Sequence, residues 1–113
     1  MKAIFKELPP FERFRKDYLT DDQFVALQQL MLLDPEIGDV IKGSGGLRKM
    51  RLGDPRRGKG KRGGLRIIYY WWISAELFLL FAIYGKDEMD DLSPKELSLL
   101  ATMLTREKER NAR

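Results

Sequence analysis

The chain has 113 residues, of which 43% are hydrophobic and 34% are charged, and its net charge is +4. This length suffices for one compact domain, and we expect a single domain over residues 1–113. The chain contains neither cysteine nor histidine, which excludes disulfides, thiol nucleophiles and zinc–thiolate sites. Acid–base chemistry must then use Lys, Arg, Asp, Glu or Tyr, and we expect no metal and no cofactor.

The distribution of charged and polar residues argues against a signal peptide and against a membrane span. The N-terminal residues are charged every few positions and lack the apolar run of a signal peptide. The longest apolar stretch, residues 65–84, is interrupted by Arg66, Ser74 and Glu76, so it is too polar for a membrane span. These features predict a cytoplasmic protein with no membrane partner.

The first half of the chain predicts one strand and two helices. Residues 2–8 alternate as a short strand, which two prolines end. Residues 11–18 carry aromatic side chains at helical spacing. A second helix begins after Thr20, whose spacing to Gln23 is that of a capping box, and it stops at the Asp-Pro pair that follows.

The second half predicts three strands and a helix. After a glycine-containing loop at 38–46, residues 47–52 alternate like a strand. Aromatic and aliphatic residues then predict strands at 65–72 and 77–84. The run from Ser93 to Glu96 has an N-cap serine, a proline at the first helical position and a glutamate two residues later, which predicts a helix start. We expect the charged tail of this helix, residues 106–113, to fray.

The resulting order is β-α-α-β-β-β-α, an α+β fold. Because the three later strands are consecutive, an antiparallel sheet is the simplest packing. We expect the two N-terminal helices on one face of this sheet, with a C-terminal helix completing the domain. The other face is expected to present Lys49, Arg51 and the glycine-rich basic loop at 53–64.

Positive charge is concentrated in one segment. From Arg48 to Arg66 the chain carries nine cations and one acid, a net charge of +8, whereas the remainder has 12 basic and 16 acidic residues, a net charge of −4. This asymmetry indicates a phosphate-rich partner. Glycines in the loop would let its cations approach a phosphate chain closely. The residues of this segment that we predict to bind RNA are Arg48, Arg56, Arg57, Lys59 and Arg62.

A basic loop by itself is more often a solvated surface or a general nucleic-acid contact than a catalytic element. Most of the aromatic residues at 69–72 are expected in the core, because a central strand is buried on both faces. One of them, or Tyr84, would be free to stack on an unpaired RNA base.

Four segments stand out in chain order: DPEIGDVI at 34–41, GSGGLRKMR at 43–51, GKGKRGGLRIIYY at 58–70 and IYGKDEMDDL at 83–92. They resemble the corresponding segments of HigB toxins within the RelE/ParE superfamily, over nearly the whole chain. The resemblance implies a RelE-like fold and an endoribonuclease that enters the ribosomal A site and cuts mRNA. It also implies a cognate antitoxin, a helix-turn-helix DNA-binding protein of the HigA kind, through which alone operator DNA would be bound.

The resemblance extends to individual basic residues. Lys49 and Arg51 match the paired basic positions on the strand before the loop in RelE. Arg66 matches the arginine that begins the next strand, and Lys86 falls in the Gly-Lys pair after the last strand. The resemblance therefore implies that these four residues belong to the catalytic site.

One part of the RelE pattern is missing. RelE has an arginine beside that last lysine and a tyrosine a few residues further on, whereas this chain has Asp87 and then Leu92 or Ser93. Tyr84 is the nearest tyrosine that can replace it, and we include it among the candidate catalytic residues.

RNA cleavage requires the ribose 2′-hydroxyl to lose a proton and attack the adjoining 3′-phosphate. A lysine crowded by other cations loses its proton more easily, so Lys49 or Lys61 is the candidate base. Arginine stays charged, so Arg51 and Arg66 are assigned to stabilising the phosphorane-like transition state. Supporting phosphate contacts are assigned to Lys59 and Lys86.

Two other functions remain open at this stage. ParE-like inhibitors of DNA gyrase share the fold but lack the basic catalytic cluster, so the +8 segment argues against that function. A basic nucleic-acid-binding module without catalysis would need the same cluster, so sequence does not exclude it.

Overall fold

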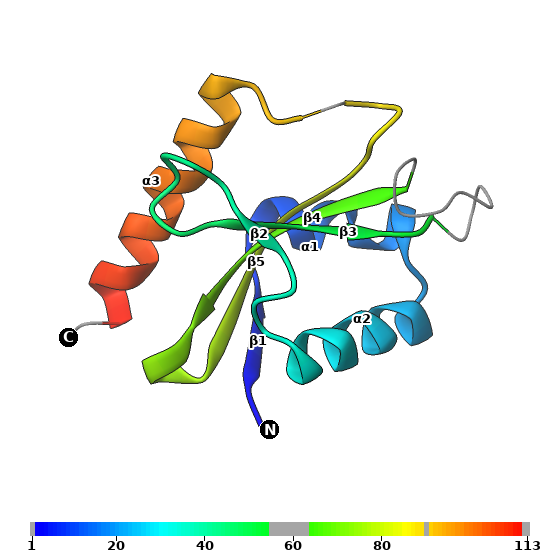
Figure 1. Cartoon of the computed structure of the whole chain (residues 1–113), viewed down its shortest axis with the longest axis horizontal. Coiled ribbons are helices and arrows are strands. Elements are labelled where there is room, and N and C mark those ends of the chain that lie inside the picture. Colours follow the sequence, from blue (N-terminus) through cyan, green and yellow to red (C-terminus); the bar gives the residue numbers. More distant parts are fainter. Residues whose placement is uncertain (1, 55–63, 90, 112–113) are drawn as a thin grey trace.

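A computed structural model describes residues 2–54, 64–89 and 91–111. In these residues five strands form one sheet with the order β1-β5-β4-β3-β2, and three α-helices cover it (Figure 1). The elements in chain order are β1 Ile4–Glu7, α1 Pro9–Tyr18, α2 Asp21–Leu33, β2 Asp39–Val40, β3 Arg48–Leu52, β4 Leu65–Trp72, the 3₁₀ turn Ile73–Ala75, β5 Leu77–Gly85 and α3 Pro94–Asn111. The predicted α+β class and the main elements are confirmed, with small shifts at their ends.

Both predicted helix starts have the expected caps. At α2 the Thr20 hydroxyl accepts from the Gln23 amide at 3.1 Å, and the Gln23 side chain accepts from the Thr20 amide at 2.9 Å. At α3 the Ser93 hydroxyl accepts from the Glu96 amide at 3.1 Å. These bonds satisfy amides that a helix N-terminus otherwise leaves unpaired. The two prolines after β1 also form the first turn of α1, where the missing N–H costs nothing.

The sheet is mixed rather than wholly antiparallel. Strands β3, β4 and β5 form the predicted antiparallel meander, but β1 pairs parallel to β5. Strand β5 is apolar along nearly its whole length and buried, so it needs a neighbour at each edge, and β1 fills the edge opposite β4. A second addition is β2, a two-residue strand inside the predicted loop, which pairs with the outer edge of β3.

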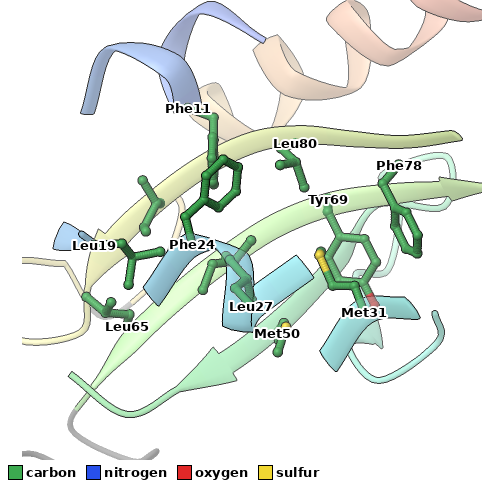
Figure 2. Packing of buried hydrophobic residues seen from close by; sticks show 12 residues of the cluster. Phe11, Leu19, Phe24, Leu27, Met31, Met50, Leu65, Tyr69, Phe78 and Leu80 are labelled. Atoms are coloured by element: carbon green, nitrogen blue, oxygen red, sulfur yellow. The ribbon is translucent and has the colours of Figure 1, made fainter. Parts of the chain in front are cut away.

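One core lies between the sheet and the two N-terminal helices. Figure 2 shows Leu27 and Met31 of α2 turned onto Met50 and Tyr69 of the sheet. Tyr69 is fully buried, and its hydroxyl donates to the Pro35 carbonyl at 2.8 Å and accepts from the Gly38 amide at 3.0 Å. These bonds tie the turn after α2 to the centre of the sheet.

A second core lies on the opposite face, under α3. Leu100 and Leu104 of α3 pack with Leu47, Ile68 and Phe81 of the sheet. The face on which we expected Lys49, Arg51 and the basic loop is therefore also the face that α3 partly covers.

The prediction that the end of α3 frays is also wrong for the residues described. The helix continues to Asn111, and Glu107 is buried in an ion pair with Lys6 of β1 at 2.9 Å. In the described part of the chain no helix is both long and apolar enough to cross a lipid bilayer.

Candidate functional site

Three predicted site residues lie directly beside one another on adjacent strands. Arg51 of β3 is paired with Arg66 of β4, and Arg66 is paired with Tyr84 of β5. Directly opposed residues of an antiparallel pair point to the same face, so the three side chains form one row across the sheet. We call Arg51, Arg66 and Tyr84 the Arg-Arg-Tyr row.

The row lies on the face that α3 partly covers. Lys49 is two residues before Arg51 on β3, so it points to the same side, as the alternation predicts. Leu47, two residues earlier again, is packed in the core under α3. In Figure 1 the C-terminal end of β3 and the N-terminal end of β4 point away from α3. The Arg51 end of the row therefore lies where α3 leaves this face uncovered, whereas Tyr84 at the other end packs in the core under α3.

Arg66 is the most deeply buried cation of the row. It is 3% exposed, and its Nη1 donates to the Leu65 carbonyl at 3.1 Å. Arg51 beside it is exposed. Burial in a central strand holds the Arg66 guanidinium in place, so little side-chain entropy remains to be lost when an anion binds. The row thus combines a fixed cation with an accessible one.

Tyr84 is the neutral member of the row. It is 5% exposed, and its buried hydroxyl has no hydrogen-bond partner among the described residues. Burial, reinforced by the charge of Asp91 and partly offset by Arg66, raises the pKa of Tyr84 to about 12. The phenol therefore keeps its proton at neutral pH and is able to donate it. Buried hydroxyls are normally paired, as that of Tyr69 is, so this one is an exception.

A pocket adjoins Tyr84 at the edge of β5. Its volume is about 200 Å³, and its lining includes Phe14 of α1, Tyr84 of β5 and Leu99 of α3. The other lining side chains are apolar, apart from Glu96. The pocket therefore lies next to the Tyr84 end of the row.

Lys49 is held by an acid that sequence reasoning missed. Its Nζ lies 3.5 Å from Oδ1 of Asp91, and the same oxygen accepts from the Leu92 amide at 3.0 Å. Both side chains of the ion pair are partly exposed. A lysine in this pair must leave the carboxylate before it can accept a proton. The one sequence signal for this contact was the cluster of acids after β5, which follows a strand next to a basic segment.

Lys86 lies where the basic loop rejoins the sheet. Its amide donates to the Gly64 carbonyl at 2.9 Å, and Gly85 is paired with Leu65 at the start of β4. Leu65 is also paired with Leu52, the last residue of β3, so both ends of the loop meet Lys86 at the same end of the sheet. The loop residues predicted for catalysis or RNA binding lie outside the described residues: Arg56, Arg57, Lys59, Lys61 and Arg62.

Arg48 is placed apart from the row. Strand alternation turns it to the opposite face, where its guanidinium donates to the Gly38 carbonyl at 2.7 Å and pairs with Glu36 at 3.1 Å. It therefore braces the turn after α2. The structure brings Lys49, Arg51, Arg66, Tyr84 and Lys86 to one face or end of the sheet and leaves Arg48 on the other side.

No metal-binding cluster is evident within the described residues, where no three acidic side chains converge. The arrangement instead offers cations that can bind a phosphate and one neutral hydroxyl that can donate a proton. Both are suited to phosphate-ester chemistry in which charge develops on oxygen.

No protein-family model matches this sequence. Among solved structures, one that is similar is that of the E. coli toxin RelE, a double arginine-to-alanine mutant in the free state. The two structures superpose with a TM-score of 0.56 at 14% sequence identity, over 91% of this chain and 97% of that chain. At this identity the likeness concerns the fold. The chain therefore has a RelE-like α+β fold.

Proposed function

We propose that this chain is the toxin of a type II toxin–antitoxin system. In this proposal it acts as a ribosome-dependent endoribonuclease of the HigB kind, which cleaves mRNA in the ribosomal A site and stops translation in the cytoplasm. Its partners are then the ribosome, mRNA and a HigA-like antitoxin. The single observation that carries the proposal is the Arg-Arg-Tyr row, with Lys49 beside it, on a RelE-like fold.

The row supports a division of roles in the cleavage step. The ribose 2′-oxygen attacks phosphorus while the bond from phosphorus to the 5′-oxygen breaks, which leaves a cyclic phosphate and a 5′-hydroxyl. Arg51 and Arg66 stabilise the negative charge that grows on the phosphate oxygens in this step. The fixed position of Arg66 suits this role, because a preorganised donor does not have to reorganise during the reaction.

Two proton transfers complete the step. Tyr84, which burial keeps protonated at physiological pH, donates its proton to the departing 5′-oxygen. The proton of the 2′-hydroxyl goes to Lys49 or Lys61 in the neutral amine form. For Lys49 this requires that its ammonium leaves Asp91 and loses a proton to solvent before the attack.

We expect cleavage to depend on the ribosome because the row lacks a complete pair of acid and base groups. Histidine is absent from the chain, and Lys49 is occupied by an ion pair. Such a site gains most if a large partner holds the mRNA so that the 2′-oxygen, phosphorus and 5′-oxygen are already in line.

Expression of the chain without its antitoxin tests the proposal. We expect growth arrest, with mRNA cut inside translated regions and a parallel loss of protein synthesis. A gyrase inhibitor would instead change DNA supercoiling and leave mRNA intact. A binding module without catalysis would coat RNA but produce no new RNA ends. Either of these two results would contradict the proposed function.

A further inference from the structure

Helix α2 and the turn after it expose large apolar side chains to solvent, beside the polar Asp22 and Gln29. Leu33 is 84% exposed, and Val25, Leu30 and Ile37 are exposed as well. We call Val25, Leu30, Leu33 and Ile37 the α2 outer face. The side that faces the core carries Phe24, Leu27 and Met31.

The other two helices each expose one large apolar side chain, Phe14 on α1 and Leu99 on α3. Their solvent-facing sides are dominated by charged residues, as expected for helices with one buried face. In α1 these are Glu12, Arg13, Lys16 and Asp17, and in α3 they include Lys95, Arg106, Glu109 and Arg110. Exposed apolar patches of this kind mark surfaces for protein partners.

The surroundings of the α2 outer face are acidic. From residue 17 to residue 41 the chain has six acidic residues and neither lysine nor arginine. Two of these acids are neutralised from outside the segment, because Asp21 pairs with an arginine of α1 at 2.7 Å and Glu36 pairs with one of β3 at 3.1 Å. The acids that flank the outer face from within the segment include Asp22 and Asp34.

This charge selects the kind of occupant. RNA would be repelled by the acids, so it does not fit this face. A second copy of the chain, docked through the same face about a two-fold axis, would oppose acids to acids. A protein segment with aliphatic side chains along one side and lysines or arginines beside them would match both the apolar surface and its charge.

We propose that the α2 outer face is the docking surface for such a basic, amphipathic segment of a partner protein, which under the proposed function is the antitoxin. The inference rests on that function for the identity of the partner. Helix α2 packs on one face of the sheet and the Arg-Arg-Tyr row lies on the other. Partner binding and RNA cleavage are therefore separable by substitution.

Leu33→Arg tests the proposal, with Ile73→Arg as the matched control. Ile73 is 68% exposed in the turn between β4 and β5, so the control makes the same change at a similarly exposed site away from α2. The probe is the protein encoded by the neighbouring gene, and we expect its co-expression to restore growth to cells that make the wild-type chain. Its Kd for each variant is measured by calorimetry, and a thermal melt shows that each variant is folded.

We expect Leu33→Arg to arrest growth as the wild type does, to escape neutralisation by the antitoxin and to raise the Kd at least tenfold. Ile73→Arg should be neutralised normally. Asp22→Lys should weaken binding severalfold at low salt and less at high salt, because salt screens the added charge. Should Leu33→Arg melt early, Val25→Arg replaces it under the same criteria.

An unchanged Kd for folded Leu33→Arg or Val25→Arg overturns the docking surface, even if the wild-type chain is a toxin. A wild-type dimer that Leu33→Arg dissociates overturns it too, since the occupant is then a second copy. Failure of the wild-type chain to arrest growth counts against the proposed function instead, and the Kd of the neighbouring gene product still decides the docking surface.

Discussion

The Tyr84 hydroxyl has no hydrogen-bond partner within the part of the chain that the structure describes, and from this we predict that one substitution changes stability and activity in opposite directions. Tyr84→Phe removes only the hydroxyl and keeps the ring that packs under α3. A buried polar group without a partner costs about 1–3 kcal/mol, so its removal should raise the free energy of unfolding by about 1 kcal/mol. For a domain of this size that corresponds to a rise in Tm of roughly 3–6 °C. Activity should fall at the same time, because the proposed proton donor is lost.

Tyr69→Phe is the matched control on the neighbouring strand. Tyr69 is also buried, but its hydroxyl bonds to Pro35 and Gly38. Its removal leaves the Gly38 amide and the Pro35 carbonyl without this partner, so we expect a loss of about 1–3 kcal/mol with catalysis retained at temperatures where the variant is folded. The two variants should therefore move the Tm in opposite directions.

The pH dependence of stability provides a second measurement on the same pair of proteins. The pKa of Tyr84 is about 12 in the folded chain, against an ordinary value of 10.0. Between these two values the unfolded chain has lost the tyrosine proton and the folded chain has kept it, so the folded state binds more protons. Stability then falls as pH rises above 10, by up to about 1.4 kcal/mol per pH unit for this group, and it is unaffected below.

Two measurements check these predictions on stability, pH dependence and activity. They are urea unfolding of the wild type and Tyr84→Phe between pH 7 and pH 12, and a growth-arrest assay of both. Tyr84→Phe should be more stable at pH 7, should lose less stability above pH 10 and should arrest growth weakly. A less stable Tyr84→Phe variant would show that the hydroxyl is paired in the folded protein. A more stable variant with full toxicity would remove Tyr84 from the proposed mechanism.

Other predictions concern the cations and the second core. Arg66→Ala should reduce cleavage roughly a hundred- to a thousand-fold, and Arg66→Lys should restore part of it. Arg48→Ala, on the opposite face, should leave cleavage unchanged. A folded Arg66→Ala variant with wild-type toxicity would refute the assignment of Arg66 to the cleavage site. Asp91→Asn should tighten RNA binding by up to about fivefold by releasing Lys49, and looser binding in a filter assay would contradict this contact. Affinity for RNA should fall steeply with salt, with a log–log slope of about −0.7 to −0.9 for each phosphate neutralised, and a flat dependence would exclude the electrostatic model. Glu107→Gln should lower stability by about 1–2 kcal/mol without affecting toxicity, and unchanged urea unfolding would show that its ion pair contributes nothing.

Local patterns in the sequence sufficed for the elements and for part of the site. The capping spacings at Thr20 and Ser93 predicted two helix starts because a cap depends only on neighbouring residues. The alternation in residues 47–52 likewise predicted that Lys49 and Arg51 share a face, because a strand has a period of two.

The row itself could not be derived in this way, because it depends on the register between strands. A slip of one residue between β3 and β4 would turn Arg66 to the opposite face from Arg51, and the long loop between the two strands does not determine which register forms. The irregularity between Ile68 and Tyr69, which shifts the pairing of β4 with β5, also leaves no clear local signal. The contact of Asp91 with Lys49 depends on the path of the segment after β5 across the sheet.

The parallel pairing of β1 was missed for a similar reason. Its sequence specifies a strand, but its position beside β5 depends on which edge of the sheet remains open after β4 has paired. The burial of Glu107 is a consequence of the same placement, since Lys6 of β1 reaches it from there. Long-range packing therefore decided the features that local patterns did not.

The decisive measurement is the rate at which the purified chain cleaves one defined mRNA in two states. In one state the mRNA is bound to ribosomes whose A site is empty, and in the other it is free in solution. We expect rapid cutting at the A-site codon on ribosomes, slow or undetectable cutting of free mRNA, and loss of the ribosomal cut with folded Arg66→Ala. Equal rates on free and ribosome-bound mRNA, or an intact A-site codon after prolonged incubation with folded wild-type chain, would contradict this expectation.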